Sequence, residues 1–284
     1  MRIEDARLIR RDVLVAPGDP AGGFARQRSG AAARPVNVGQ AELLEGCQVV
    51  DVLRRGKQLA LVGREAGGAE RVLLVQLGMT GQVLLEDEGA EPCAHTHVHA
   101  VWTLRTTRAG GKSGRDCVMR FRDPRRFGGL RVVGTRDDLA ALWAELGPDA
   151  LEVTAEDVLR IREGSSRAIK ALLLDQCAIA GVGNIYADEA LFRAGIRPSR
   201  RARTLKRAEA GALADAIRVV LGEAVAAGGS TIRDYRNAEG GQGEYQGRHA
   251  VYGRGGSPCG VCGRTLRRGI VGQRTTVWCS GCQR

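Results

Sequence analysis

Four cysteines near the C-terminal end of the chain have the spacing of a metal site. Cys259 and Cys262 form one C-x2-C pair, and Cys279 and Cys282 form a second pair after sixteen intervening residues. Thiolates two residues apart can bind one tetrahedral zinc ion, and a hairpin of this length brings the second pair beside the first. Four sulfur ligands leave no open coordination position, so the sequence predicts one structural Zn ion rather than a catalytic metal.

The hairpin predicted between the two cysteine pairs is basic. Its cationic residues are Arg264, Arg267, Arg268 and Arg274. A rigid basic hairpin of this kind suits DNA, RNA or a protein partner, and the segment by itself leaves all three open.

A glycine-rich turn lies in the segment CAIAGVGNIYADEALF, residues 177–192, between two stretches of helical character. Its glycines allow a tight turn and leave backbone N–H groups at the start of the second helix, where a phosphate can bind. We expect Asp188 and Glu189 in the first turn of that helix, where the helix dipole favours acidic side chains. An ordinary helical hairpin is the alternative for this stretch alone.

The composition favours a nucleic-acid partner. The 284 residues include 43 Lys and Arg against 32 Asp and Glu, with a net charge of +11 and a pI near 9.8. Such an excess is typical of proteins that bind nucleic acids, and a solvated basic surface without a ligand is the alternative. No apolar run approaches the length of a membrane span, and the segment MRIEDARLIRR lacks the apolar core of a signal peptide. We therefore expect a cytoplasmic, nucleoid-associated protein without a membrane partner.

The hydrophobic pattern changes along the chain. Residues 1–134 are rich in short Val- and Leu-containing segments separated by Gly and polar turns, as in a sandwich or barrel, with a loop predicted around 17–40. Residues 137–227 have helical spacing, and 228–258 is Gly-rich and irregular. The four remaining cysteines are scattered, which is typical of small buried side chains in a reducing compartment.

Several motifs together resemble the formamidopyrimidine-DNA glycosylase and endonuclease VIII family. In chain order they are RRGKQLAL, VQLGMTGQV, HTHV, DPRRFGG, AIKALLLDQCAIAGVGNIYADEALFRAGIRP, GGSTIRDYRNAEG, VYGRGGSPC and the cysteine hairpin. The resemblance implies an α+β fold with three parts: a β-sandwich domain over 1–134, a helix-two-turn-helix domain over 135–248, and a four-cysteine zinc-finger hairpin over 249–284.

The resemblance also implies which residues contact DNA. Such proteins bind damaged double-stranded DNA and rotate the damaged nucleotide out of the stack, and we expect this chain to do so as a monomer. It implies that Asn184 and Lys170 hold the DNA backbone near the lesion. Arg274 matches an arginine that grips flanking phosphates and assists the final elimination. His95 and His97 match a DNA-facing pair, with a structural role as the alternative.

Three residues match those that fill the space left by the rotated nucleotide. Met79 lies on the turn LGMTG, and Arg125 and Phe127 lie in DPRRFGG. A thioether and an aromatic ring can wedge into a base stack, and a guanidinium can hydrogen-bond the orphaned base. Without the resemblance, Met79 and Phe127 are more typical of core residues.

Lys57, in RRGKQL, matches a lysine that the family uses in glycosidic cleavage and β-elimination. Its neighbours Arg54 and Arg55 disfavour the ammonium form, which makes an amine available near neutral pH. A simple phosphate contact is the alternative for an exposed lysine in a basic run.

The N-terminal segment departs from the family pattern. Family members begin with Pro-Glu after the initiator Met, at the start of a helix, and the proline amine forms a Schiff base with the sugar. This chain begins MRIEDARL, so we expect that the nucleophile, its glutamate and the first helix are missing. Three explanations are open: a fragment of an ordinary enzyme, a lesion binder without chemistry, or substitution of the amine by Lys57 or the α-amino group of Met1.

The sequence thus predicts a base-excision-repair DNA glycosylase and abasic-site lyase that acts on oxidised purines by base flipping and Schiff-base elimination. A catalytically silent lesion or abasic-site DNA-binding protein of the same fold is the first alternative. An RNA- or ribosome-associated zinc protein is the second, and it leaves DPRRFGG and LGMTG unexplained.

Overall fold

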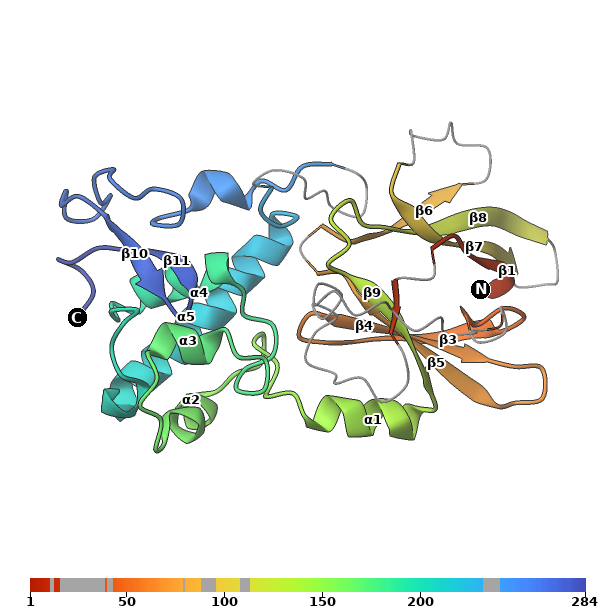
Figure 1. Cartoon of the computed structure of the whole chain (residues 1–284), viewed down its shortest axis with the longest axis horizontal. Helices are drawn as coiled ribbons and strands as arrows, with labels where there is room; N and C mark the ends of the chain where they lie inside the picture. The colour runs from red at the N-terminus through yellow and green to blue at the C-terminus, as the bar shows by residue number, and fades with distance from the viewer. Residues whose placement is uncertain are drawn as a thin grey trace. The chain divides into compact units, whose positions relative to one another are not determined.

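The computed structural model of this chain describes residues 1–10, 13–15, 39, 43–78, 80–87, 96–107, 113–231 and 241–284. Two compact units are present (Figure 1). Each has its own buried hydrophobic core. Of the described residues, the first unit contains those within 1–145 together with 241–242, and the second contains 146–231 and 243–284. The loop predicted over 17–40 lies almost entirely outside the described residues.

The first unit contains a sheet in the spatial order β2-β9-β5-β4-β3-β1-β7-β8-β6. All neighbouring strands pair antiparallel except β2 and β9, which pair parallel. The described strands are β1 (Arg2–Leu8), β2 (Leu14–Val15), β3 (Gln48–Arg55), β4 (Gln58–Arg64), β5 (Glu70–Gln76), β6 (Gln82–Asp87), β7 (Val98–Thr107), β8 (Ser113–Arg122) and β9 (Gly129–Gly134).

This sheet folds over on itself to give a sandwich. Strands β3 and β1 meet at the single register pair Arg2 and Gln48, so the sheet turns a corner there. The strands on the two sides of the corner form two layers (Figure 1). Ile3, Leu73, Trp102 and Phe121 are buried in one core cluster that draws on both layers.

Helix α1 (Arg136–Ala144) covers the outer face of β4 and β5. It begins at Thr135, whose side chain and that of Asp138 form a capping box. Leu139 is buried with Val62 and Leu74 from the sheet. The contacts of α1 therefore place it in the first unit. The helical pattern of the sequence had assigned these residues to the second domain. The predicted domain boundaries 1–134, 135–248 and 249–284 stay a prediction.

The second unit is helical and carries the cysteine hairpin. Its elements are α2 (Ala155–Arg162), α3 (Ile169–Leu173), α4 (Asn184–Arg193), the 3-10 helix η4 (Ala202–Thr204), α5 (Arg207–Ala226), the 3-10 helix η5 (Tyr245–Arg248), β10 (Arg267–Val271) and β11 (Arg274–Trp278). Helix α5 buries Leu213, Ile217 and Leu221 along one stripe against the other helices. The strands β10 and β11 pair antiparallel beside α4 (Figure 1).

The predicted fold class is confirmed: a β-sandwich, a helical helix-two-turn-helix region and a four-cysteine hairpin follow one another along the chain. Among the described helices, none is both long enough and apolar enough to cross a membrane.

Candidate nucleic-acid interface

The four predicted metal ligands lie together at the base of the β10–β11 hairpin. The sulfur atoms of Cys259, Cys262, Cys279 and Cys282 all lie within 4.8 Å of one another. The distance from Cys262 Sγ to Cys279 Sγ is 3.4 Å, and that from Cys259 Sγ to Cys282 Sγ is 3.9 Å. A tetrahedral ion with metal–sulfur bonds of about 2.3 Å requires sulfur separations of roughly 3.8 Å. The cluster therefore fits one metal ion with four thiolate ligands.

Tight turns in the backbone hold the cysteines in this arrangement. The Cys259 N–H donates to the Arg264 carbonyl at 2.8 Å, and the Gly263 N–H donates to the Cys259 carbonyl at 2.9 Å. Gly263 has a φ of 71°, which favours glycine at this position. In the second pair, the Gln283 side chain accepts from the Cys279 N–H at 2.8 Å. Each C-x2-C segment therefore closes on itself.

Arg274 lies at the tip of the same hairpin and is exposed. Val271 pairs with Arg274, so Gly272 and Gln273 form a two-residue turn, with φ values of 57° and 61°. Positive φ at both positions is typical of the type I′ turn of tight hairpins. A Cβ at Gly272 would lie 2.9 Å from the Cβ of Ala171 in α3, so the tip packs closely on that helix. This packing holds the hairpin tip, and with it the backbone of Arg274, against α3.

Lys170 is buried beneath this hairpin, and its predicted role as a contact of the DNA backbone stays a prediction. Its ammonium pairs with Asp188, with 2.7 Å between Nζ and Oδ1, and both side chains have no exposed surface. It also donates to Thr276 Oγ1 at 2.8 Å and to the Thr275 carbonyl at 3.0 Å. An ammonium can donate three hydrogen bonds, and two of them are made here, beside the ion pair with Asp188. Lys170 therefore ties α3 and α4 to β11.

Burial opposes the charge on both members of this pair. Desolvation lowers the pKa of Lys170, and the Asp188 carboxylate acts in the opposite direction. Desolvation likewise raises the pKa of Asp188 to about 6, against the effect of the ammonium. Asp188 Oδ2 also accepts from the Val277 N–H at 3.0 Å. Removing one partner would leave the other charged group buried without compensation.

Asn184 begins α4 directly after the glycine-rich turn and faces the hairpin. Its Nδ2 donates to the Thr275 carbonyl at 3.2 Å, the same carbonyl that accepts from Lys170. No side chain accepts a capping hydrogen bond from the first backbone N–H groups of α4. The Gln176 side chain holds the turn, because its Oε1 accepts from the Gly181 N–H at 2.9 Å. The structure thus brings the segments of Lys170, Asn184 and Arg274 together.

The dipole argument placed Asp188 and Glu189 in the first turn of α4, and this prediction was wrong. Both are buried one turn later, where they hold other segments. The Glu189 carboxylate accepts from the backbone N–H groups of Ala250, Val251 and Tyr252 at 2.8, 3.0 and 2.7 Å. It thereby fixes the chain that leads into the cysteine hairpin.

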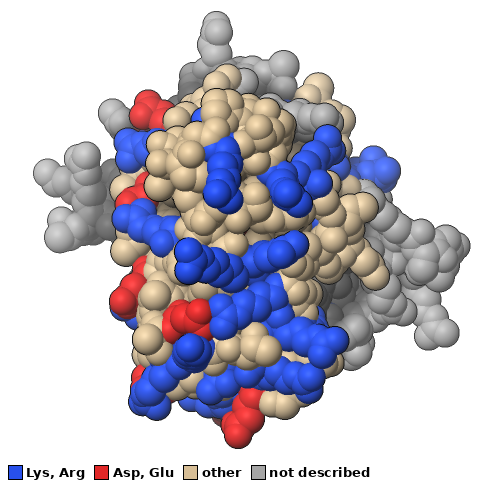
Figure 2. Space-filling view, turned by 90° about the vertical axis from the view of Figure 1, so that its left-hand side faces the viewer, with Lys and Arg blue, Asp and Glu red and all other residues tan. Residues whose placement is uncertain are grey.

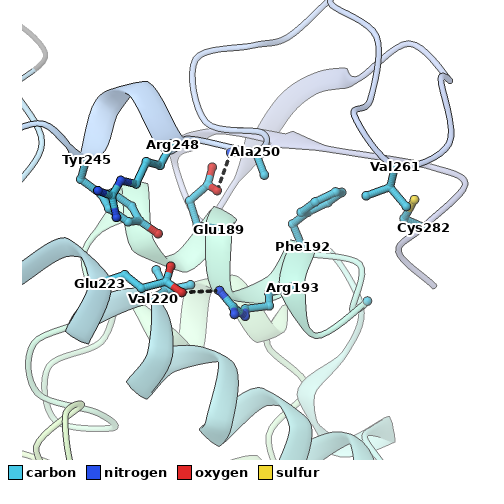
Figure 3. A pocket seen from close by; sticks show the side chains of 11 residues that line it. Glu189, Phe192, Arg193, Val220, Glu223, Tyr245, Arg248, Ala250, Val261 and Cys282 are labelled. Carbon is cyan, nitrogen blue, oxygen red and sulfur yellow. Dashed lines mark hydrogen bonds and ion pairs between the residues drawn. The ribbon is translucent and has the colours of Figure 1, made fainter. Parts of the chain in front are cut away.

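A pocket lies beside Glu189 between α4, α5 and the segment 245–250 (Figure 3). Arg193 of α4 pairs with Glu223 of α5 at 3.0 Å on one side of it, and Glu189 is turned toward the Ala250 amide on the other. Phe192 and Val220 supply apolar surface between them. Both carboxylates that line the pocket therefore already have partners.

In the first unit, Lys57 lies in the turn between β3 and β4 and is exposed. Arg55 pairs with Gln58, so Gly56 and Lys57 form a two-residue turn, and Gly56 has a φ of 56°. A positive φ at the first position alone is typical of a type II′ hairpin turn. The Arg54 guanidinium donates to the Gly56 carbonyl at 3.0 Å. The sequence RRGKQ therefore forms a hairpin that presents Lys57 at its tip.

The DPRRFGG segment forms a loop around a buried carboxylate. Asp123 has no exposed surface, and its Oδ1 accepts from the Thr80 hydroxyl at 2.5 Å and the Arg125 N–H at 3.2 Å. Its Oδ2 accepts from the Gly128 N–H at 2.7 Å. The loop therefore closes over Asp123, which was not singled out in the sequence.

Arg125 and Phe127 lie together on this loop. The guanidinium carbon of Arg125 is 4.7 Å from the centroid of the Phe127 ring, within the range of a cation–π contact. Arg125 is exposed and Phe127 is half-buried. Arg126 between them has a φ of 55°, which turns the backbone so that the flanking side chains lie on one side. Two of the three predicted void-filling residues, Arg125 and Phe127, are thus adjacent.

Met79 lies outside the described residues, but both of its neighbours pack on the same loop. The Thr80 hydroxyl binds Asp123, and a Cβ at Gly78 would lie 2.6 Å from the carbonyl carbon of Phe127. Only glycine fits at position 78, which also has a φ of 64°. The turn LGMTG and the loop DPRRFGG are therefore joined by direct contacts.

Of the two predicted DNA-facing histidines, His95 lies outside the described residues. His97 is exposed, has a φ of 72°, and its carbonyl accepts from the Asp123 N–H at 3.0 Å. The buried His99, which the sequence prediction did not include, lies with Nε2 2.8 Å from the Asp123 carbonyl oxygen, to which it donates. His97 and His99 therefore both support the loop that carries Arg125.

A β-sandwich followed by a helix-turn-helix clamp and a four-cysteine hairpin defines the class of helix-two-turn-helix proteins. The family model described as "Formamidopyrimidine-DNA glycosylase H2TH domain" matches residues 146–236, and the "Formamidopyrimidine-DNA glycosylase N-terminal domain" matches 24–130. The chain belongs to the formamidopyrimidine-DNA glycosylase family.

Individual relatives agree with this membership. The formamidopyrimidine-DNA glycosylase of Xanthomonas campestris pv. campestris (strain B100) is 40% identical over 246 residues, which cover 86% of this chain and 84% of that protein. The solved structure of the Fpg protein of Thermus thermophilus is 44% identical and covers 86% of both chains, with a TM-score of 0.68. A Lactococcus lactis Fpg mutant, solved with DNA that contains Fapy-dG, is 26% identical and covers 100% of this chain and 92% of its own, with a TM-score of 0.76.

Proposed function

We propose that this chain binds duplex DNA at oxidised purines and abasic sites, and that it acts there as a DNA glycosylase with abasic-site lyase activity. Family membership supports this function, and so does the relative solved with DNA that contains Fapy-dG. The ligand is damaged double-stranded DNA, bound by one copy of the chain.

The observation that carries the proposal is the junction of α4 with the cysteine hairpin. Asn184 binds the Thr275 carbonyl, next in sequence to the exposed Arg274, and α4 begins there without a side-chain cap. A helix N-terminus, a carboxamide and a guanidinium are all groups that bind phosphate oxygens. The junction therefore has the chemistry of a clamp on the DNA backbone.

The loop of the first unit supports the lesion-specific part. Arg125 and Phe127 lie stacked and accessible, and the turn that carries Met79 packs against them. An aromatic ring can replace a missing base in the stack, and an exposed guanidinium can bind the unpaired partner base. These side chains therefore suit a duplex from which one nucleotide has been rotated.

The cysteine cluster is proposed to bind one Zn ion. Four thiolate ligands at these separations suit tetrahedral zinc, and the set leaves no ligand position for substrate. The ion would stabilise the hairpin that carries Arg274 and take no part in the chemistry.

Lys57 is proposed to take part in cleavage of the abasic site. A primary amine attacks the C1′ aldehyde carbon, and loss of water gives an imine. Removal of a C2′ proton then expels the 3′ phosphate, so the strand breaks by β-elimination. The exposed position of Lys57 at a hairpin tip leaves its side chain room to reach a sugar.

The experiment is a gel-shift titration with a duplex that contains one abasic site, alongside an intact duplex and a structured RNA. Borohydride is added in parallel to trap an imine, with Lys57→Met as the matched variant. Selective binding with an adduct that maps to Lys57 supports both binding and chemistry. Selective binding without an adduct supports the binding function and overturns the lyase. Equal binding of all three ligands overturns the proposal in favour of a general nucleic-acid binder.

A further inference from the structure

The segment that follows α4 is strongly basic. Seven of the fifteen residues in RAGIRPSRRARTLKR, residues 193–207, are Arg or Lys, and none is acidic. The segment includes η4 and ends where α5 begins. It contains none of the residues predicted to contact the lesion. Its charge therefore calls for a separate explanation.

Some of these cations are used inside the protein. Arg193 pairs with Glu223 at 3.0 Å, Arg200 with Glu209 at 2.6 Å, and Arg207 with Glu156 at 2.8 Å. These three pairs hold the segment against α5 and α2.

Three arginines of the segment are left for a partner. Arg197, Arg201 and Arg203 are exposed, and among the described residues none of them has a carboxylate within ion-pair distance. Like charges that are close in sequence and lack a counter-charge repel one another, and an external anion would relieve this repulsion. The three side chains are therefore available to an anion from outside.

The backbone beneath these arginines is fixed on both sides. Arg203 N–H donates to the Ser165 carbonyl at 3.2 Å, and Ala202 N–H donates to the Arg167 carbonyl at 2.9 Å. At the other end, Arg197 N–H donates to the Arg284 carbonyl at 2.9 Å. Because the backbone is already held, binding an anion would order only the side chains.

The basic surface continues beyond this segment. The Arg284 N–H donates to the Gly195 carbonyl at 3.0 Å, so the last residue lies beside Arg197 and is itself exposed. Figure 2 looks onto this end of the second unit and shows Lys and Arg side chains spread across it, with few acidic groups between them. We call Arg197, Arg201, Arg203 and Arg284 the arginine surface.

We propose that the arginine surface is a second contact for duplex DNA, which binds backbone phosphates away from the lesion. Arginines bind phosphate oxygens through paired N–H groups, and a row of them neutralises successive phosphates without reading sequence. The inference rests on the proposed function for the identity of the ligand. It adds a site distinct from Asn184 and Arg274.

The test is a triple variant, Arg197→Gln with Arg201→Gln and Arg203→Gln, in the full chain. Its matched control is Arg7→Gln with Arg64→Gln and Arg71→Gln in the first unit. These three arginines also lie at the surface but pair with Asp5, Glu70 and Glu65. Both variants lower the net charge equally, so only the position of the lost charge differs. Thermal unfolding of each variant shows whether the fold is kept.

Affinity for an intact duplex is measured by fluorescence anisotropy over a series of salt concentrations. We expect the triple variant to bind roughly tenfold or more weakly and to lower the salt slope by about 2 to 3, since each lost phosphate contact contributes about 0.9. The control should change the slope little. The preference for an abasic over an intact duplex should stay as in the wild type, because the clamp is untouched.

Two results would overturn the arginine surface as a DNA contact: a salt slope in the triple variant equal to that of the wild type, or equal losses in the triple variant and its control. In either case a retained preference for the abasic duplex would leave the proposed function standing. A wild-type chain that binds the abasic and the intact duplex equally well would instead refute the proposed function. The two failures are therefore distinguishable.

Discussion

The two units hold their candidate DNA-binding residues in different ways. In the first unit, Lys57 lies on a two-residue hairpin turn, and Arg125 lies on a loop closed by Asp123, two residues away. In the second unit, Lys170 binds Thr276, more than one hundred residues along the chain, and Asn184 binds Thr275. The first arrangement draws mainly on nearby residues, with Thr80 joining the loop from 43 residues away. The second exists only when the helices and the cysteine hairpin are folded together.

Removal of the metal should have the largest effect, and it should fall on the second unit alone. Structural zinc sites contribute on the order of 10 kcal/mol, which a hairpin of this size cannot replace. We expect chelation, or Cys262→Ser, to unfold residues 259–282 and to abolish DNA binding. Hydrogen exchange would show the loss of protection in β10 and β11 while the sandwich strands stay protected. Full DNA affinity in metal-free protein would contradict the dependence of the clamp on the hairpin.

The buried ion pair should give the next largest effect. Asp188→Asn leaves the Lys170 ammonium buried without a counter-charge, which typically costs about 3–5 kcal/mol of unfolding free energy. The double variant Lys170→Met with Asp188→Asn removes both charges and keeps an acceptor for the Val277 N–H, so it should recover much of this loss. Urea unfolding of the two variants measures the difference. A double variant as unstable as Asp188→Asn would show that the pair is not what holds these elements.

In the first unit, Asp123 should matter most. Asp123→Ala leaves the Arg125 and Gly128 N–H groups and the Thr80 hydroxyl without their acceptor, at a cost of about 2–3 kcal/mol. We expect the variant to lose its preference for an abasic duplex and to keep its affinity for an intact one, because the clamp of the second unit is unaffected. Competition between the two duplexes measures this preference, and Thr80→Val serves as the milder control. An equal loss for both duplexes would assign the loop a general role.

The contrast between local and long-range positioning also explains what the sequence could predict. The C-x2-C spacing specifies short-range geometry, so the cysteine cluster and the hairpin between its two pairs could be predicted. The burial of Lys170 could not, because its partners Asp188 and Thr276 lie 18 and 106 residues away. A hint was present: helical spacing places Asp188 among the buried residues Ala187 and Leu191 of α4, where an acid needs a partner. Asp123 likewise stands out only once the loop has closed around it.

The salt dependence of DNA binding distinguishes a residue that contacts phosphate from one that only positions other groups, and variants of Arg274 and Lys170 allow this comparison. Arg274→Ala should weaken binding to every duplex and lower the salt slope by about one, as expected for one lost phosphate contact. Lys170→Met should also weaken binding, through displacement of β11, but it should leave the slope unchanged. Anisotropy titrations at several salt concentrations give both slopes. A slope lowered by about one in Lys170→Met would assign Lys170 a direct contact with phosphate, and an unchanged slope in Arg274→Ala would exclude such a contact for Arg274.

The smallest effect we expect is on the stability that Glu209 contributes. Its pKa is shifted in the opposite direction from that of Asp188 in the same unit. Hydrogen bonds from Arg200 at 2.6 and 2.8 Å, followed by the Lys206 N–H at 2.7 Å, lower the pKa of Glu209. Its pKa in the unfolded chain is about 4.3, so its contribution to stability is present above that pH and disappears as the pH falls through the lower folded value. The side chain is 32% exposed, so the contribution is about 0.5–1 kcal/mol.

Glu209→Gln should therefore lower the unfolding free energy at pH 7, and its difference from the wild type should be smaller at about pH 3, because protonation of Glu209 removes the paired charge. Urea unfolding at the two pH values measures this, with Glu163→Gln as a control at a glutamate that lies in no ion pair among the described residues. Asp188 has the opposite sign, because burial raises its pKa to about 6 and favours its neutral form in the folded state. The exposed pair thus gains stability as the pH rises, and the buried carboxylate loses it. A difference for Glu209→Gln that is undiminished at pH 3 would mean that packing, and not charge, holds the arginine segment to α5.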